Sequence, residues 1–206
     1  MNTNSETLHR RILVIDDNQA IHQDFRKIFG VRSESEAALS EAESTLFNEP
    51  SSDEPRIEFQ IDSAFQGQEG LALVQKAREE NYPYALLFVD GRMPPGWDGI
   101  ETTVKIWEED PEAQIVICTA YSDYSWDEMV AKLPKSDQLL ILKKPFDTIE
   151  VLQMAHCMTE KWRLHQAVKF KLEHLQLNVD SRTRVLESEI SKLKAEIESL
   201  REVKKA

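Results

Sequence analysis

Short runs of aliphatic and β-branched residues alternate with helical patterns from residue 11 onward, and this alternation constrains the fold more than any other feature. The runs lie at residues 11–15, 57–64, 84–89, 114–118 and 139–142. Between them, apolar residues recur at helical spacing, as at Leu71, Val74 and Ala77. Strands that alternate with helices form right-handed β-α-β units. The pattern therefore predicts an α/β fold with a parallel sheet that is covered on both faces.

The commonest five-stranded arrangement of this kind is doubly wound and flavodoxin-like, with the strand order 2-1-3-4-5 and ligands at the carboxyl ends of the strands. Helices are expected near residues 20–29, 71–77, 100–109 and 126–133. Residues 30–56 exceed a normal connection, and we expect an extra short helix and a polar loop there. The chain is thus expected to comprise a polar tail at 1–10, an α/β domain at 11–160 with an insertion at 30–56, and a helix at 161–206.

Charge and composition exclude several classes of protein. The formal net charge of -12 argues against nucleic-acid binding, because a phosphate backbone selects basic surfaces. No apolar run reaches the roughly 20 residues of a membrane span, and residues 1–11 have no signal-peptide core. Cys118 and Cys157 have no metal-binding spacing and are expected to be free thiols in a reducing compartment. These features predict a soluble protein of the cytoplasm.

Polar residues of particular types follow four of the five predicted strands. Asp16 and Asp17 follow the first strand, Asp90 the third, Thr119 the fourth and Lys144 the fifth. In a parallel sheet these positions meet at one edge, where three carboxylates would repel one another unless a cation were bound. Oxygen ligands with room for water favour Mg²⁺. A hydroxyl and an ammonium group beside such a site predict a receptor for phosphoryl oxygens.

These residues resemble the receiver domain of two-component response regulators. The shared motifs, in chain order, are Asp16-Asp17, Asp90 with Met93-Pro94 and Asp98-Gly99, Thr119-Ala120 and Lys144-Pro145. The resemblance extends over about residues 10–161. It implies a cytoplasmic phosphoryl acceptor that receives its phosphoryl group from a sensor histidine kinase or a phosphotransfer protein. It also implies slow self-dephosphorylation, and we expect the chain not to be an enzyme, since its sequence shows no separate catalytic domain.

The resemblance also assigns individual roles. Asp90 would accept the phosphoryl group, and Asp17, Asp90 and the backbone carbonyl of Arg92 would bind Mg²⁺, with Asp16 acting through water. Thr119 would close on the phosphoryl group and Lys144 would pair with one of its oxygens. Lys144 is preferred over Lys143 because it immediately precedes the proline.

The sequence departs from the family pattern at four places. The loop after Asp90 is one residue longer, and we expect a type II turn at Pro95-Gly96. Ile141 occupies a position that is often aromatic in the family, so the aromatic part of the switch would be absent or supplied by Tyr121 or Tyr124. Gly91 replaces a bulkier residue, and the insertion at 30–56 is the fourth departure.

The C-terminal segment has helix-forming residues without Gly or Pro from Asp147 to the end, with Glu150 at capping spacing. A heptad repeat predicts a parallel two-stranded coiled coil and hence a homodimer, because Ile at a with Leu at d favours that state. The residues expected to form the dimer seam are Leu172, Val179, Leu186, Ile190, Leu193, Ile197 and Leu200. Charged pairs across the dimer would be opposite in sign at Arg182–Glu187, Glu189–Lys194 and Glu196–Arg201.

Two features of this segment leave alternatives open. The polar residues Gln176 and Thr183 occupy a positions and weaken the upper half, where Val168, Leu172, Leu175 and Val179 could instead form the seam in a shifted register. A signal could use such a change of register. The segment could also fold back on its own domain as an amphipathic helix.

Other functions fit the sequence less well. His165 and His174 lack the acid and proline that follow the phosphorylated histidine of kinases, and Asp16-Asp17-Asn18 does not supply the Asp-x-Asp-x-Thr of haloacid-dehalogenase phosphatases. A non-phosphorylated dimeric scaffold with the receiver fold is a further alternative. So is the N-terminal input part of a larger protein, such as a diguanylate cyclase, a phosphodiesterase or a hybrid histidine kinase.

Overall fold

The computed structural model of the chain describes residues 10–30, 59–120, 132–133 and 136–203. At its centre is a five-stranded parallel sheet with the order β2-β1-β3-β4-β5. This confirms the predicted α/β fold and strand order. The strands are β1 (Arg11–Ile15), β2 (Gln60–Ala64), β3 (Leu86–Asp90), β4 (Gln114–Thr119) and β5 (Leu139–Lys143).

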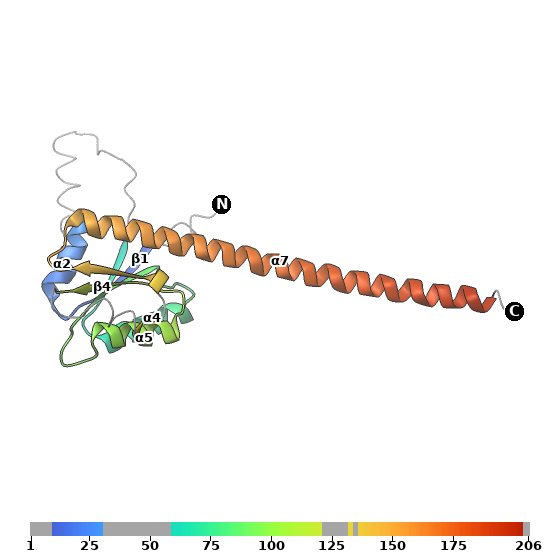
Figure 1. Ribbon diagram of the computed structural model, residues 1–206, viewed down its shortest axis with the longest axis horizontal. Coiled ribbons are helices and arrows are strands. Elements are labelled where there is room, and N and C mark those ends of the chain that lie inside the picture. Colours follow the sequence, from blue (N-terminus) through green and yellow to red (C-terminus); the bar gives the residue numbers. More distant parts are fainter. Residues whose placement is uncertain (1–9, 31–58, 121–131, 134–135, 204–206) are drawn as a thin grey trace, which may run out of the picture. The chain divides into compact units, whose positions relative to one another are not determined.

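Helices cover both faces of the sheet (Figure 1). One face is covered by α4 (Gly67–Glu79) and α5 (Gly99–Glu109), and the other by α2 (Gln19–Ile28) and the first turns of α7 (Thr148–Val203). A short 3-10 helix, η2 (Ser136–Gln138), precedes β5. Among the described residues, no helix is long and apolar enough to cross a membrane.

Side chains cap the helices at the edge of the sheet where the acids gather. The Asn18 side chain accepts a hydrogen bond from the Ala20 amide at 3.0 Å and so begins α2. Asp147 and Glu150 form the predicted reciprocal cap of α7: the Asp147 carboxylate accepts from the Ile149 amide at 2.7 Å, and the Glu150 carboxylate accepts from the Asp147 amide at 3.4 Å. The caps fix where each helix begins relative to its strand.

Alternating residues of the strands fill two separate apolar clusters. Leu13 and Ile15 of β1 face the cluster under α4 and α5, whereas Ile12 and Val14 face the cluster under α2 and α7. Phe25 of α2 is fully buried in the second cluster. Its ring contacts those of Phe88 and Phe146, with centroids 4.7 and 5.4 Å away. Each such side chain contributes about 1.5–3 kcal/mol through burial.

The chain divides into two compact units, Met1–Arg163 and Leu164–Ala206. We call them the receiver unit and the tail. Trp162 is buried at the end of the receiver unit, and the tail residues 167–195 are all exposed. The boundary expected after residue 160 stays a prediction. The helix expected within the 30–56 insertion and most of the one expected at 126–133 lie outside the described residues.

Candidate functional site

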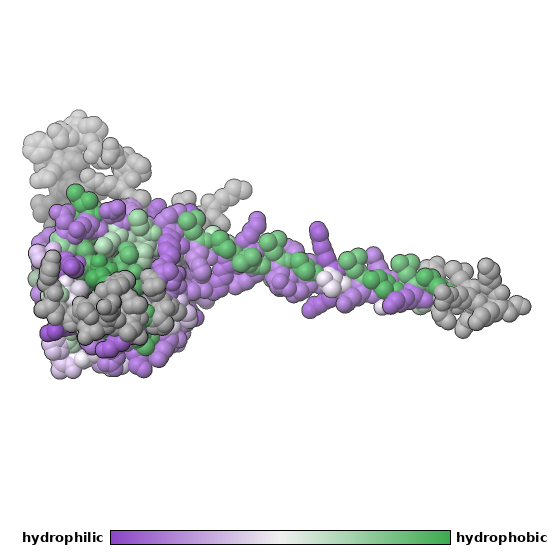
Figure 2. Space-filling view, in the orientation of Figure 1, coloured by the Kyte–Doolittle hydropathy of each residue, from purple (hydrophilic) through white to green (hydrophobic). Residues whose placement is uncertain are grey.

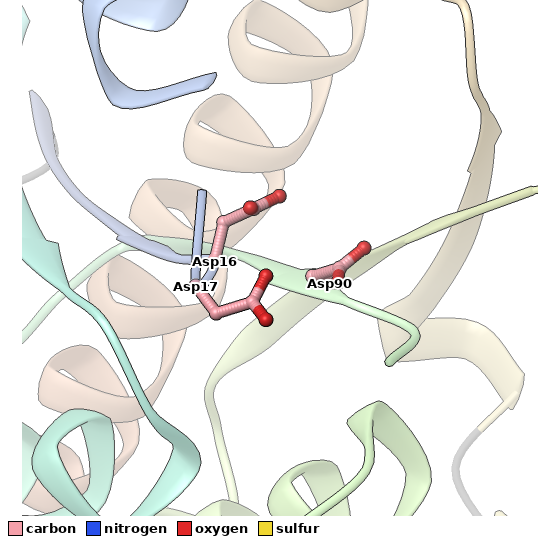
Figure 3. Close-up of side chains that lie close together, drawn as sticks. All are labelled: Asp16, Asp17 and Asp90. Atoms are coloured by element: carbon pink, nitrogen blue, oxygen red, sulfur yellow. The ribbon is translucent and has the colours of Figure 1, made fainter. Parts of the chain in front are cut away.

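Three carboxylates meet where β1 and β3 end (Figure 3). Asp16 and Asp17 follow β1, and Asp90 is the last residue of β3. The two strands are neighbours in the sheet, with Ile15 opposite Val89. One oxygen from each carboxylate lies within 4.8 Å of the others. Asp16 is buried, Asp90 is half-buried and Asp17 is exposed, so the cluster opens to solvent through Asp17.

Lys144 joins two of these acids. Its Nζ lies 2.7 Å from Asp16 Oδ2 and 2.7 Å from Asp90 Oδ1, and donates hydrogen bonds to both. The Lys144 amide also donates to the carbonyl of Thr119 at 2.9 Å, which keeps the end of β5 beside β4. Lys143, the last residue of β5, is exposed. The structure therefore brings the second lysine, and not the first, to the acid cluster.

Burial and nearby charges shift the pKa values of Asp90 and Lys144 in different ways. Burial raises the pKa of the Asp90 carboxyl and the nearby charge of Asp16 adds to this increase, whereas the hydrogen bond and charge of Lys144 oppose it. Burial alone would lower the pKa of Lys144, but its hydrogen bonds to Asp16 and Asp90 outweigh this effect and raise the pKa. Lys144 is therefore an ammonium group at neutral pH.

The residues of this cluster fit a divalent cation. Three carboxylates and one ammonium group leave two excess negative charges. Lys144 occupies one oxygen of Asp16, and the Asn18 amide donates to the other at 2.9 Å. Asp90 likewise accepts from Lys144 at 2.7 Å and from the Arg92 amide at 3.3 Å, so direct coordination by Asp17 and Asp90, with Asp16 acting through water, stays a prediction. All the donors are oxygens, which matches the preference of Mg²⁺.

The other predicted site residues lie around Asp90. Thr119 ends β4 and is buried, and its hydroxyl donates to the carbonyl of Ala120 at 3.1 Å. The Arg92 amide donates to Asp90 Oδ2 at 3.3 Å, and binding of a cation by its carbonyl stays a prediction. A side chain at Gly91 would bring its Cβ to 3.3 Å from the Cys118 carbonyl and 3.4 Å from Thr119 Oγ1. The distance to Thr119 is an ordinary van der Waals contact, so a side chain at this position would crowd only the Cys118 carbonyl, by a few tenths of an ångström.

The loop after Asp90 corrects the expected turn. The Gly96 amide donates to the Met93 carbonyl at 3.0 Å, so the turn is centred on Pro94-Pro95, whose peptide bond is cis, and not on Pro95-Gly96. Gly96 also does not have the positive φ that the third position of a type II turn requires, since Gly30 is the glycine with positive φ among the described residues. The loop closes at Gly99, where any side chain would overlap the carbonyl oxygen of Asp90.

The structure describes Ile141, which occupies the position that is often aromatic in the family, but not the two tyrosines that could replace the aromatic residue. Ile141 of β5 is partly buried against the cluster under α4 and α5. Tyr121 and Tyr124 lie outside the described residues.

One residue at the site was not singled out by sequence reasoning. His22 of α2 is only 3% exposed, and its Nε2 lies 2.7 Å from the backbone oxygen of Asp16. A signal was present, because His22 precedes Phe25 by three residues and Phe29 by seven and so shares their apolar helix face. A histidine on that face is ordinarily a packing residue, and its distance from Asp16 is not visible in the sequence.

The predicted seam residues of the tail lie on an exposed helix. Figure 2 shows hydrophobic residues recurring along the tail among hydrophilic ones. The side chain of Leu200 lies outside the described part of the chain. The described seam residues each expose about half of their surface or more: Leu172, Val179, Leu186, Ile190, Leu193 and Ile197.

Solved structures resemble the chain in fold. An adenylate cyclase from Rhodopirellula baltica matches with a TM-score of 0.57 and 18% identity over 80% of this chain and 97% of that one. A signal receiver domain of an HD domain-containing protein from Pseudomonas fluorescens Pf-5 matches with a TM-score of 0.55 and 16% identity, covering 81% and 98%. A CheY-like receiver domain protein from Methanospirillum hungatei JF-1 matches with a TM-score of 0.53 and 20% identity, covering 76% and 98%. No curated protein matches the chain significantly.

The family assignment comes from a match to the response regulator receiver domain over residues 52–156. The match covers just over half of the chain and includes Asp90, Thr119 and Lys144, but it begins after Asp16 and Asp17. The structure supplies the missing part, because β1 lies between β2 and β3 in the same sheet and delivers the acid pair to Asp90. With the family match, the strand order and the similar solved structures together, this chain belongs to the response regulator receiver family.

Proposed function

We propose that the chain accepts a phosphoryl group on Asp90 from a histidine kinase or a phosphotransfer protein. The observation that carries this proposal is the Lys144 ammonium group, which lies 2.7 Å from the carboxylates of both Asp16 and Asp90 at the carboxyl edge of the sheet. A structural ion pair would need only one acid. An ammonium group held beside an acceptor carboxylate can instead bind the oxygens of an incoming phosphoryl group.

In the proposed reaction, an Asp90 oxygen attacks the phosphorus of a phosphohistidine in line. The new O–P bond forms as the P–N bond breaks, and the imidazole nitrogen leaves with the bonding electron pair. Asp17, Asp90 and the Arg92 carbonyl would hold Mg²⁺ directly, with Asp16 acting through water. When bound, Mg²⁺ would offset negative charge on the transferred phosphoryl group. Lys144 would exchange its bond to Asp90 for one to a phosphoryl oxygen.

Thr119 is the proposed link between phosphorylation and the rest of the domain. Its hydroxyl donates to Ala120 in the present structure, and it would turn to donate to a phosphoryl oxygen. The Thr119 carbonyl accepts from the Lys144 amide, so movement at the end of β4 would be felt at Lys144, four residues before α7 begins at Thr148.

Labelling with acetyl phosphate and Mg²⁺, followed by intact-mass measurement, tests the acceptor. The wild-type chain should gain one phosphate, and Asp90→Asn should gain none. Asp17→Ala should lose labelling through loss of the cation. Lys144→Ala should label far more slowly, whereas its matched control Lys143→Ala should label as wild type does.

Labelling of Asp90→Asn to the wild-type level would refute the assignment. A chain that neither labels nor binds BeF₃⁻ would be a non-phosphorylated scaffold.

We further propose that the tail forms a parallel coiled-coil homodimer. An isolated helix cannot bury its own apolar stripe, and the exposed seam positions recur with heptad spacing. Arg182 and Glu187 would pair across the dimer, as would Glu189 and Lys194. All four are exposed and available to a second copy.

Cysteine crosslinking tests the orientation. In a parallel dimer, equivalent d positions are adjacent, so Leu186→Cys should form a disulfide between two copies in a Cys157→Ser background. The matched control, Leu177→Cys, replaces an exposed leucine outside the seam and should not crosslink. An intact chain that sediments as a monomer at micromolar concentration would exclude the dimer. Crosslinks between antiparallel positions alone would exclude the orientation.

A second candidate is that the receiver is the input part of a larger cytoplasmic protein. The tail continues as helix to Val203, and a similar solved receiver belongs to an HD domain-containing protein. In that case the coiled coil would carry the signal to an effector domain. The complete reading frame tests this directly, because an effector domain following the tail would be encoded downstream.

A further inference from the structure

His22 contacts the backbone of the acid pair at Asp16. It is 3% exposed, and its Nε2 is 2.7 Å from the backbone oxygen of Asp16. A carbonyl oxygen only accepts hydrogen bonds, so Nε2 must carry the proton and donate it. The Asp16 carbonyl precedes α2, which begins at Gln19, and therefore lies outside the helix's own hydrogen-bond ladder. Among the described residues, the imidazole is the donor that this carbonyl receives.

The remaining polar groups of Asp16 are also held. Its amide donates to Ala64 at 3.1 Å, and its two carboxylate oxygens accept from Asn18 and Lys144. The carbonyl that His22 holds belongs to the peptide bond joining Asp16 to Asp17. Asp17 is exposed, so the direction of its carboxylate depends on the backbone that carries it. Fixing this peptide plane fixes the backbone of Asp17 and so limits where its carboxylate can reach.

The surroundings of the ring argue against a role in packing alone. The ring packs against Phe65, with centroids 4.6 Å apart, but its Nδ1 is buried without a hydrogen-bond partner among the described residues. A buried unpaired nitrogen carries an energetic cost that an apolar side chain of similar size would avoid. The histidine is thus explained by its other nitrogen, the one that donates to Asp16.

We propose that His22 is a positioning residue for the cation site, which acts by orienting the Asp16–Asp17 peptide so that Asp17 can coordinate Mg²⁺. This inference rests on the proposed function, since it concerns the same site. Partners that orient metal ligands typically contribute ten- to a hundredfold in affinity, and we expect about tenfold here because His22 acts through the backbone.

The test measures Mg²⁺ affinity of the intact chain by titration calorimetry, with melting temperatures recorded in EDTA. His22→Phe keeps an aromatic ring and removes the donor, and it should weaken Mg²⁺ binding about tenfold. His22→Gln restores an N–H at a similar reach and should bind within about twofold of wild type. Phe25→Leu destabilises the same helix without touching Asp16, and it should lower the melting temperature while leaving the affinity unchanged. His22→Leu is a second donor-free variant in case His22→Phe does not fold.

The outcomes separate the two proposals. Wild-type affinity in His22→Phe or His22→Leu would overturn the positioning role, and so would an equal loss in Phe25→Leu. Failure of the wild-type chain itself to bind Mg²⁺ would instead refute the cation site of the proposed function, and the role of His22 with it.

Discussion

In the receiver unit, Phe25 and Leu87 are fully buried, whereas Leu186 and Leu193 of the tail each expose 57% of their surface. Both regions contain apolar residues at regular spacing, with similar side chains. The strands of the receiver unit bury theirs against α2, α4, α5 and the first turns of α7. The receiver unit thus completes its core within one chain, so its stability should not depend on protein concentration. The tail offers a stripe that only another surface can cover.

The largest expected effect comes from breaking the tail seam. The double variant Ile190→Asp/Leu193→Asp should raise the dissociation constant of the proposed dimer at least a thousandfold. Four apolar side chains, two from each copy, would lose their burial, and each contributes about 2 kcal/mol. Sedimentation velocity over a range of concentrations would show a monomer. Thermal unfolding of the receiver unit should be unchanged.

A matched control uses an equally apolar residue outside the seam. Leu177 is 69% exposed but does not occupy an a or d position, so Leu177→Asp should leave the sedimentation of the chain unchanged. If Leu177→Asp dissociates the chain as strongly as the double variant, the heptad register is wrong.

The next largest effect is expected from a substitution in the core of the receiver unit. Phe25→Ala should lower the free energy of unfolding by about 3–5 kcal/mol, because it leaves a cavity among Phe29, Phe88 and Phe146. Urea denaturation followed by circular dichroism measures the change. The difference from wild type should be the same at low and high protein concentration. A concentration-dependent difference would mean that the two regions are not energetically separate.

A smaller effect concerns the charge of Asp90 in the metal-free chain. The folded-state pKa of Asp90 is raised, so the unfolded chain ionises first as the pH increases. As the pH rises from the ordinary carboxyl pKa to the raised value, the free energy of unfolding of wild type should therefore fall relative to that of Asp90→Asn. Below the ordinary carboxyl pKa, the difference between the two should not change with pH. Urea denaturation at a series of pH values in EDTA measures this difference.

Lys144 does not disturb this pH window. Its folded-state pKa is also raised, so the stability that it contributes is complete below the ordinary lysine pKa and is lost only in alkali. If the stability difference between wild type and Asp90→Asn is constant across the acid range, Asp90 is not the group that burial perturbs.

The smallest effect is expected from removing an ion pair near the junction of the two regions. Lys161 of α7 pairs with the Asp137 carboxylate at 3.7 Å and donates a hydrogen bond to the Asp137 carbonyl. Both side chains are well exposed, so Lys161→Ala should cost at most about 1 kcal/mol, and less at high salt. Thermal melts at two ionic strengths measure it. A larger loss that salt does not reduce would indicate that this contact anchors α7.

Much of the receiver unit was predictable because its signals are local. Each strand is a short apolar run, and the Asp147–Glu150 cap is a local sequence pattern that the structure confirms. The turn after Asp90 was predicted wrongly as type II at Pro95-Gly96. Nothing in the local sequence shows which of the two adjacent prolines occupies the second position of the turn, and the structure places Pro94 there.

The sequence alone determined the α/β fold, the strand order and the position of the acids after the strands, since the alternation of apolar runs and helices allows few parallel arrangements. Only the tertiary structure decided that Lys144 contacts both Asp16 and Asp90, and that His22 lies against the Asp16 carbonyl. The lysine is 128 residues from Asp16 in the chain. Such contacts depend on how strands and helices pack across the sheet, and spacing along the chain does not encode a distance in space.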